Sequence, residues 1–204
     1  RRVLFRSVSG AGRSAREVRD PRDADRLREL LREAVAVDDA PTMIRFGKGS
    51  VSKQLEAARR LADGVDVLRE GASKDVLLVG VGAMSNLALA AADLLAAEGI
   101  GCTVIDPRWV VPVPKSVLEL AAEHRLVVTI EDGVKVGGIG TRVRQDLRDA
   151  QIDTALTELG LPDEFLEHAS REEILERVGL TAEAVAKQIS QQVTGQRIPH
   201  ARPN

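Results

Sequence analysis

The chain has 204 residues, of which 44% are hydrophobic, and its net charge is only −2, so it can form a core and has no basic excess that favours nucleic acid. Only 2% of the residues are aromatic, with one Trp and no Tyr, which leaves no series of stacking platforms for single-stranded nucleic acid. No apolar run is long enough for a membrane span, no signal peptide is evident, and the single Cys102 excludes an internal disulfide, so we expect a cytoplasmic protein.

The first quarter of the chain is uneven in character. Residues 1–19 are rich in Arg, Ser and Gly without an apolar period, and are expected to be disordered or foreign to the natural protein. A helix and then a short strand, Thr42 to Phe46, are predicted next. The helix is predicted from an apolar stripe of Leu27, Leu30, Leu31, Ala34 and Val35. Because one helix and one strand cannot bury their own apolar faces, residues 20–50 are interpreted as the end of a larger domain. Residues 51–73 are polar and predicted to be a linker.

Three apolar runs, residues 76–79, 102–105 and 126–130, stand out in the central part of the chain. They are short, continuous and rich in β-branched residues, which is typical of strands covered on both faces of a parallel sheet. Helical patterns separate them. The first has a stripe of Leu87, Ala91, Leu94 and Leu95, with Ser85 as the expected N-cap and Gly99 as the stop. The second has Val117, Leu118 and Ala121 after a loop that Pro112 and Pro114 keep out of helix.

Further elements follow towards the C-terminus. A fourth strand is predicted over residues 153–159, helices over 171–178 and 181–193, and a frayed tail from 196 to 204. The alternation of strand and helix predicts an α/β domain over residues 74–195, with an open, mostly parallel sheet, right-handed crossovers and helices on both faces.

Several separated motifs carry a family resemblance. These motifs resemble the C-terminal domain of the transketolase superfamily. They are Val79-Gly-Val-Gly-Ala-Met, Thr103-Val-Ile-Asp-Pro-Arg-Trp-Val-Val-Pro and Val128-Thr-Ile-Glu-Asp-Gly with Gly137-Gly-Ile-Gly. Within that superfamily, Gly160-Leu-Pro-Asp-Glu-Phe-Leu-Glu-His-Ala-Ser resembles the 1-deoxy-D-xylulose-5-phosphate synthase family. Ile44-Arg-Phe-Gly-Lys-Gly resembles the end of the pyrimidine-binding domain of that family, and the resemblance covers residues 21–193.

The resemblance implies a chemistry that depends on a cofactor. Such synthases use thiamine diphosphate and Mg²⁺ to decarboxylate pyruvate and to join the two-carbon unit to D-glyceraldehyde 3-phosphate. The product feeds isoprenoid, thiamine and pyridoxal synthesis. The family holds Mg²⁺ with a Gly-Asp-Gly motif and a later Asn, a pattern this sequence lacks, since Glu131-Asp132-Gly133 is not one. The catalytic Glu and active-site His residues of the family lie upstream of the retained part.

The chain is therefore expected to be a C-terminal fragment that is inactive alone. It is expected to contain no catalytic, cofactor-binding or metal-ligating residue and to bind neither thiamine diphosphate nor Mg²⁺ by itself. Its expected partners are the remainder of the same enzyme and a second copy in a homodimer, with no nucleic acid and no membrane.

Two basic residues are candidates for binding the substrate phosphate. In the family, the basic residue of an aromatic-Pro-Arg-Gly turn contacts the sugar phosphate, and the matching residue here is Lys48. Gly47 replaces the Pro and loosens the turn, and the Lys offers a point charge where the family has a bidentate fork. A solvated Lys beside a turn glycine is the equally weighted alternative. Arg45 is a weaker candidate, because on a regular strand it points to the opposite side.

Other features have simpler interpretations. Gly80 and Gly82 lack the third glycine of a dinucleotide motif and favour a tight turn from strand to helix. Gly137, Gly138 and Gly140 are expected to let a helix begin close to the sheet. Glu131 and Asp132 are expected to face opposite ways, which argues against shared acid–base work. Cys102 is expected in the core, His168 as a packing or capping residue, and the three His show no metal spacing.

A second class of function stays open at this point. The same kind of domain in the decarboxylating subunits of 2-oxo-acid dehydrogenases helps to dock an acyltransferase core, so the chain is alternatively an interaction module. The segment from Gly160 to Ser170 favours the synthase.

Overall fold

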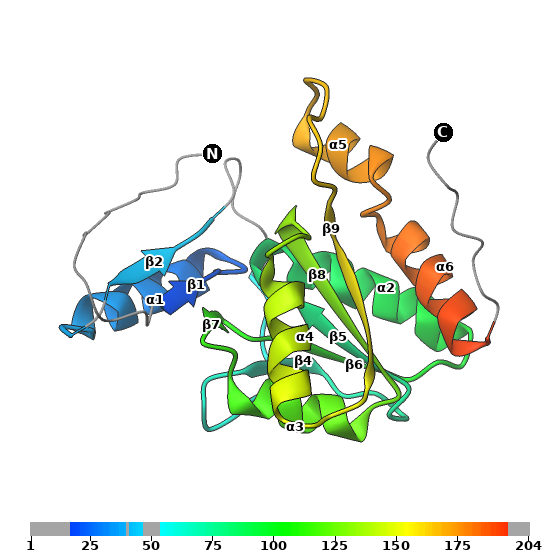
Figure 1. Ribbon diagram of the computed structural model, residues 1–204, viewed down its shortest axis with the longest axis horizontal. Coiled ribbons are helices and arrows are strands. Elements are labelled where there is room, and N and C mark those ends of the chain that lie inside the picture. Colours follow the sequence, from blue (N-terminus) through cyan, green and yellow to red (C-terminus); the bar gives the residue numbers. More distant parts are fainter. Residues whose placement is uncertain (1–16, 40, 47–53, 196–204) are drawn as a thin grey trace.

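The computed structural model describes residues 17–39, 41–46 and 54–195. A small N-terminal unit, built from residues 17–39 and 41–46, lies beside a larger sheet unit with helices on both faces (Figure 1). The N-terminal unit comprises β1 (Glu17–Arg19), α1 (Ala24–Ala36) and β2 (Thr42–Ile44). Its two strands form a three-stranded sheet with β7 (Trp109–Val111), in the order β2-β1-β7. Strand β7 comes from the sheet unit, so the two units share this small sheet.

The main sheet has six strands in the order β3-β4-β6-β5-β8-β9. They are β3 (Arg59–Arg60), β4 (Asp66–Arg69), β5 (Val76–Gly80), β6 (Cys102–Asp106), β8 (Leu126–Val134) and β9 (Ala155–Leu161). Strands β6, β5, β8 and β9 are parallel, whereas β3 and β4 form an antiparallel edge. The predicted open, mostly parallel sheet is thereby confirmed. Strand β8 runs beyond the predicted end because it continues through an irregularity after Ile130.

Two apolar clusters cover the two faces of this sheet. Helices α2 (Ser85–Ala97) and α6 (Ala182–Val193) pack on one face, and α3 (Lys115–Glu123) and α4 (Ile139–Asp149) pack on the other. Along β5, Val76 and Leu78 belong to the first cluster, while Leu77 and Val79 belong to the second. This alternation follows from the two-residue period of a strand. Helices on both faces, as predicted, explain why the strand sequences are continuously apolar.

Helix α2 begins differently from the prediction. A short 3₁₀ helix, η1 (Gly82–Met84), precedes it, so Ser85 is the first helical residue and its Oγ donates to the carbonyl of Gly80 at 3.0 Å. Gly82 has a φ of +55°, which permits the tight turn expected at the end of β5. The buried stripe consists of Ala88, Ala91, Ala92 and Leu95. The predicted Leu94 is 39% exposed, because the stripe is centred one position away from the predicted one.

Two segments predicted to lack regular structure contain strands. Part of the expected linker forms the β3–β4 hairpin at the sheet edge, where Val65 and Val67 are buried. Residues 17–19, expected to be disordered, form β1. Both were missed because such short strands are defined by their neighbours and carry several charged residues. The division of the chain into two domains stays a prediction, and residues 1–16 and 196–204 lie outside the described ranges.

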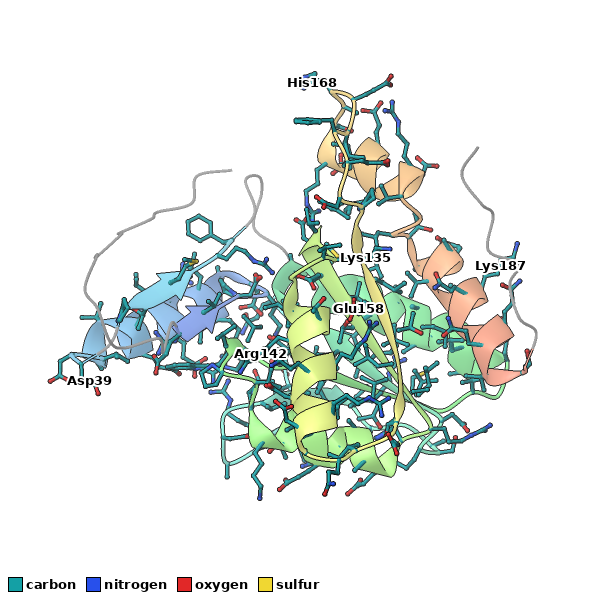
Figure 2. The ribbon with its side chains drawn as sticks, in the orientation of Figure 1. Asp39, Lys135, Arg142, Glu158, His168 and Lys187 are labelled. Atoms are coloured by element: carbon teal, nitrogen blue, oxygen red, sulfur yellow. The ribbon has the colours of Figure 1, made fainter. Side chains whose placement is uncertain are left out.

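Residues 162–178, which we call the arm, follow β9 and carry α5 (Arg171–Arg177) (Figure 1). Leu175 and Val178 of the arm pack against the first apolar cluster. Ser170 caps α5: its Oγ accepts from the N–H of Glu173, whose carboxylate accepts from the N–H of Ser170. His168 lies exposed at the tip of the arm and is therefore neither a packing nor a capping residue (Figure 2). Among the helices of the described ranges, none is long and apolar enough to span a bilayer.

Candidate functional site

The N-terminal unit meets the sheet unit at the carboxyl ends of the parallel strands, and we call this contact the junction. Asp20 contacts Gly82 after β5, Arg22 contacts Asp106 at the end of β6, and Arg45 approaches Gly133 in β8. In open α/β sheets this edge is where ligands usually bind. The junction is therefore the candidate site of the described chain, and it is filled by the chain's own charged side chains.

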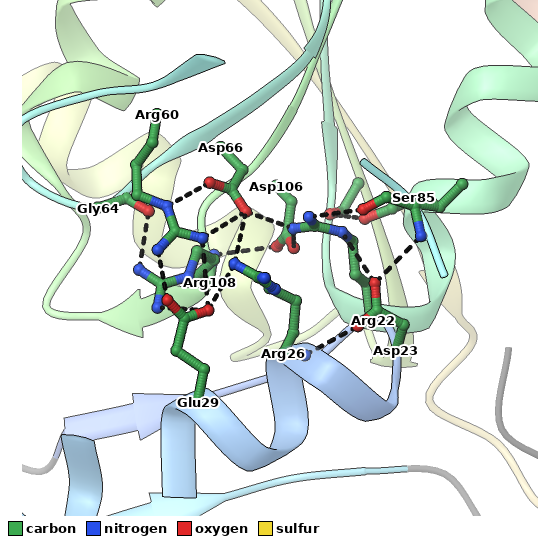
Figure 3. A network of polar contacts seen from close by, with 12 residues as sticks. Arg22, Asp23, Arg26, Glu29, Arg60, Gly64, Asp66, Ser85, Asp106 and Arg108 are labelled. Carbon is green, nitrogen blue, oxygen red and sulfur yellow. Dashed lines mark hydrogen bonds and ion pairs between the residues drawn. The ribbon is translucent and has the colours of Figure 1, made fainter. Parts of the chain in front are cut away.

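Arg22 is the centre of the junction (Figure 3). Its Nη1 donates to Asp66 Oδ2 at 2.6 Å and to Asp106 Oδ2 at 2.7 Å, and its Nη2 donates to the carbonyl of Leu55 at 2.9 Å. Its Nε lies 3.4 Å from Asp23 Oδ2. The side chains of Arg22 and of all three aspartates are at most 1% exposed. One guanidinium thus holds three carboxylates in a dry environment, where ion pairs are strong and unpaired charges costly.

A second set of contacts surrounds this centre and ties α1 to the sheet unit. Arg60 donates to Asp66 at 2.6 Å and also pairs with Glu29 of α1. Arg108 pairs with Glu33 of α1 at 2.5 Å. The same Glu33 accepts from the indole Nε1 of Trp109 at 2.8 Å. Glu29, Glu33 and Arg60 are partly exposed, although Arg108 is buried, so these pairs contribute less to stability than the central ones.

Burial decides the protonation of the carboxylates in the junction. It raises the pKa of Asp106 to about 6 against the opposing effect of Arg22, and the pKa of Asp20 to about 7 against that of Arg45. Burial also acts to raise the pKa of Asp66, but hydrogen bonds from Arg60 and Arg22 outweigh it, and the pKa of this carboxyl is lowered. The junction therefore contains groups whose pKa values are shifted in opposite directions.

The structure places Arg45 in an ion pair. Its Nε and Nη2 lie 2.7 Å and 2.6 Å from Asp20 Oδ2, and its Nη1 reaches towards Gly133. Arg45 therefore bridges the N-terminal unit and the end of β8. The role expected for Arg45, a weak contact to a substrate phosphate, stays a prediction. Lys48, the preferred phosphate ligand, lies outside the described residues.

Glu131 was singled out in the sequence, and its surroundings are unusual. Its side chain is buried, and Oε1 accepts from the amide of Gly140 at 3.0 Å, so this carboxylate caps α4. Burial raises its pKa, although the amides of α4 act against this. Asp132, the next residue, pairs with Arg171 of α5 at 3.1 Å. Glu131 thus caps α4 and Asp132 pairs with Arg171, while both carboxylates also interact with Arg45. The expectation that they do not share acid–base work stays a prediction.

The glycines around Glu131 make room for this carboxylate. A Cβ on Gly138 would lie 2.8 Å from its Cδ, and one on Gly160 would lie 3.3 Å from its Cγ. The expectation that Gly137, Gly138 and Gly140 serve the start of a helix is confirmed, because α4 begins at Ile139 and the Gly140 amide is taken by Glu131. This helix start is thus already neutralised by a side chain of the protein.

We expect Gly133→Ala to lower the free energy of unfolding by about 1 kcal/mol, because the new Cβ displaces the guanidinium of Arg45. That Cβ would lie 3.0 Å from Arg45 Nη1 and 3.1 Å from Glu131 Oε2. Urea unfolding gives the value. In an Arg45→Ala background the cost should fall, since the displaced group is gone. An equal cost in both backgrounds would contradict the predicted contact.

Cys102 and one of the three histidines have structural roles. Cys102 is a free, buried thiol whose pKa is raised by burial to about 12, as expected for a core residue. His124 is buried between the carbonyl of Leu120 and Thr103 Oγ1, at 2.7 Å and 2.9 Å, and burial lowers its pKa. In the ranges the structure describes, no group of three or more His, Cys, Asp or Glu side chains is arranged to hold a metal ion.

Comparison with known protein families shows which family this architecture belongs to. The family model described as the transketolase C-terminal domain matches residues 63–185, which include β4, β5, β6, β8 and β9. The chain belongs to the transketolase family through this domain. The match begins at residue 63, within the segment predicted to be a linker. The junction thus joins a transketolase C-terminal domain to a short segment that precedes it.

Curated relatives are similar in sequence to most of the chain. The chain is 68% identical over 183 residues to a 1-deoxy-D-xylulose-5-phosphate synthase of Clavibacter sepedonicus and 66% identical to that of Leifsonia xyli subsp. xyli. Each alignment covers 90% of this chain and 28% of the relative. The chain therefore spans little more than a quarter of the length of these relatives.

Solved structures support the same fold. A split-gene transketolase, described as an inactive beta4 tetramer, is 31% identical, with a TM-score of 0.78 over 90% of this chain and 59% of the other. A transketolase of Pichia stipitis, the R525L mutant, is 17% identical with a TM-score of 0.70, over 91% of this chain and 27% of the other. At that identity the second likeness concerns the fold alone. The predicted transketolase C-terminal architecture is confirmed.

Sequence reasoning missed the residues that build the junction. Asp20, Arg22 and Asp66 were not singled out, and Asp106 and Arg108 were noted only as part of a family motif. The available signal was the presence of charged residues immediately after or inside apolar strand patterns. Asp106 ends an otherwise apolar strand, and such a buried carboxylate needs a cationic partner.

Proposed function

We propose that this chain is the C-terminal part of a 1-deoxy-D-xylulose-5-phosphate synthase. The observation that carries the proposal is the identity of 66–68% to synthases over 90% of the chain. The complete enzyme would decarboxylate pyruvate and condense the two-carbon unit with D-glyceraldehyde 3-phosphate. Because the chain spans only 28% of the length of those relatives, we propose this activity for the complete protein and not for the chain alone.

The described residues do not fit a site for Mg²⁺ and thiamine diphosphate. Magnesium prefers several carboxylate, carbonyl or water oxygens with octahedral geometry. The buried carboxylates of the junction are instead engaged by guanidinium groups: Asp66 and Asp106 by Arg22, and Asp20 by Arg45. We therefore assign the cofactor and its metal to the part of the enzyme outside this chain.

The phosphate contact of Lys48 is part of the same proposal. It is supported by the position of Lys48 three residues after Arg45, whose side chain is anchored by Asp20. A cationic side chain after β2 would offer a charge-assisted contact to the phosphate of glyceraldehyde 3-phosphate.

An interaction module of a 2-oxo-acid dehydrogenase is the alternative, and it is not favoured, because the close relatives carry the synthase name.

We also propose that the complete enzyme is a homodimer. A related chain, 31% identical, is described as a tetramer of one kind of subunit, which supports self-association. Light scattering of the complete enzyme would test this, and a monomer would contradict it. The cytoplasmic location and the absence of nucleic-acid partners stay predictions.

The decisive experiment compares the chain with the complete gene product. The 204-residue chain, supplied with thiamine diphosphate, Mg²⁺, pyruvate and glyceraldehyde 3-phosphate, is expected to consume no pyruvate. The complete protein is expected to release CO₂ and form 1-deoxy-D-xylulose 5-phosphate. Appreciable turnover by the chain alone would overturn its assignment as an inactive fragment. A complete protein that forms no such product, or whose upstream sequence lacks Gly-Asp-Gly and Asn, would overturn the synthase assignment.

A further inference from the structure

Apart from the pairing of β1 with β7, the N-terminal unit is attached to the sheet unit mainly by charged groups. Its buried Leu30 and Ala34 belong to neither apolar cluster of the sheet unit, and of its apolar side chains only the partly buried Val18 packs against one of them. The buried charged residues of the junction, in contrast, come from both units. They are Arg19, Asp20, Arg22 and Asp23 on one side and Asp66, Asp106 and Arg108 on the other. Docking of the N-terminal unit therefore depends on electrostatics more than on apolar contact.

Negative charge is in excess among these buried groups. The guanidinium of Arg19 lies over the ring of Trp109, 3.3 Å from its centroid, and that of Arg108 pairs with Glu33. Arg22 alone faces three aspartates, and only Asp66 among them receives a second close guanidinium, from Arg60. Carboxylates that share a dry site cannot all be ionised without cost, so a proton relieves the excess.

We propose that the junction is a proton-linked latch, in which docking of the N-terminal unit takes up protons on Asp20 and Asp106 and a rise in pH releases it. Arg45 of β2, Asp106 of β6 and Asp132 of β8 face Asp20, whose carboxyl also touches Gly82 of η1.

The other proton site lies under Arg22. Asp106 is faced by Arg22, by Asp66 of β4 and by the backbone N–H of Arg108, which donates to its Oδ1 at 3.0 Å. The two proposed proton sites therefore interact with each other, and both lie between the same two units.

The sign of the pH dependence follows from the shifted pKa values. In the docked state the pKa of Asp20 is about 7 and that of Asp106 about 6, both above the ordinary value of 3.8. Their protonated forms favour docking fully below the ordinary value, and this contribution is lost as pH rises through about 6 to 7. The lowered pKa of Asp66 has the opposite effect, which is lost only on acidification below its ordinary value. Docking should thus weaken between pH 6 and pH 8.

Trp109 is a built-in reporter of this equilibrium. It is the only Trp in a chain without Tyr, and its ring contacts two residues of the N-terminal unit, Arg19 and Glu33. We expect its emission in the 204-residue chain to shift to the red between pH 6 and pH 8, while far-UV circular dichroism stays nearly constant. Asp20→Asn should remove the part of this emission change that occurs at the higher pH, and Asp106→Asn the part that occurs at the lower pH.

A matched surface control is Asp153→Asn, since the side chain of Asp153 is 91% exposed and distant in sequence from the junction. The Trp109 emission of the Asp153→Asn variant should change with pH as that of the unmodified chain does. An emission that does not change between pH 6 and pH 8, or that changes equally in Asp20→Asn, Asp106→Asn and Asp153→Asn, would overturn the latch.

A second pair of variants tests the geometry without removing a titratable group. A Cβ on Gly82 would lie 2.8 Å from the Cγ of Asp20, so Gly82→Ala should hold the latch open. Gly99→Ala is the control, because Gly99 also has a positive φ, of +80°, but its Cβ would meet nothing within 4 Å. At pH 6 the emission of Gly82→Ala should resemble that of the unmodified chain at pH 8. Identical emission of the two variants would contradict the proposal.

Discussion

Arg22→Met is expected to lower the free energy of unfolding by about 3–5 kcal/mol, because it leaves Asp66 and Asp106 buried without their shared cation. The substitution keeps most of the side-chain volume, so the loss reports charge rather than a cavity. Both aspartate oxygens lie within 2.7 Å of the same nitrogen, and both side chains are fully buried. Urea unfolding followed by circular dichroism at pH 6, where the N-terminal unit is docked, measures the effect.

Arg28→Met is the matched control on the same segment. Its guanidinium is 65% exposed and pairs with Asp25, so the expected loss is about 0.5 kcal/mol or less. In the Arg22→Met background, Asp106→Asn should recover part of the lost stability, because it removes one of the stranded charges. A loss below about 1 kcal/mol for Arg22→Met would show that water reaches these carboxylates and that the junction is not dry.

Leu95→Ala is expected to cost about 2–5 kcal/mol, because Leu95 is completely buried between α2 and the rest of its apolar cluster. Its neighbour Leu94 lies on the same helix and is 39% exposed, so Leu94→Ala should cost about 1 kcal/mol or less. Thermal and urea unfolding of the two variants give a direct comparison within one turn. Equal losses would mean that the buried face of α2 is misassigned.

The strands at the centre of the sheet could be predicted because their sequences have one interpretation. Residues 76–79 and 102–105 are continuously apolar and β-branched, which suits only strands covered on both faces. The short strands could not be predicted. In β1 the sequence Glu-Val-Arg becomes a strand because β2 and β7 lie on either side of it. Its structure is a consequence of tertiary pairing rather than of local preference.

The junction could not be predicted for a related reason. Arg22 is separated by 44 residues from Asp66 and by 84 from Asp106, and no local pattern announces contacts of that range. Glu131 shows what a sequence does reveal. Its motif and the glycines after it indicated a helix beginning close to a strand, whereas the use of one of its oxygens as the cap of α4 required the fold.

The outer edge of the main sheet has a consequence for solubility. Strand β3 is only two residues long, and both Arg59 and Arg60 are exposed. A strand from another molecule adding at this edge would have to desolvate these two guanidinium groups, and it would find few free backbone groups to pair with. Short, charged edges are a common defence against edge-to-edge aggregation. Uncontrolled growth of the sheet in this direction is thereby opposed, and replacing both arginines by valine would remove that defence.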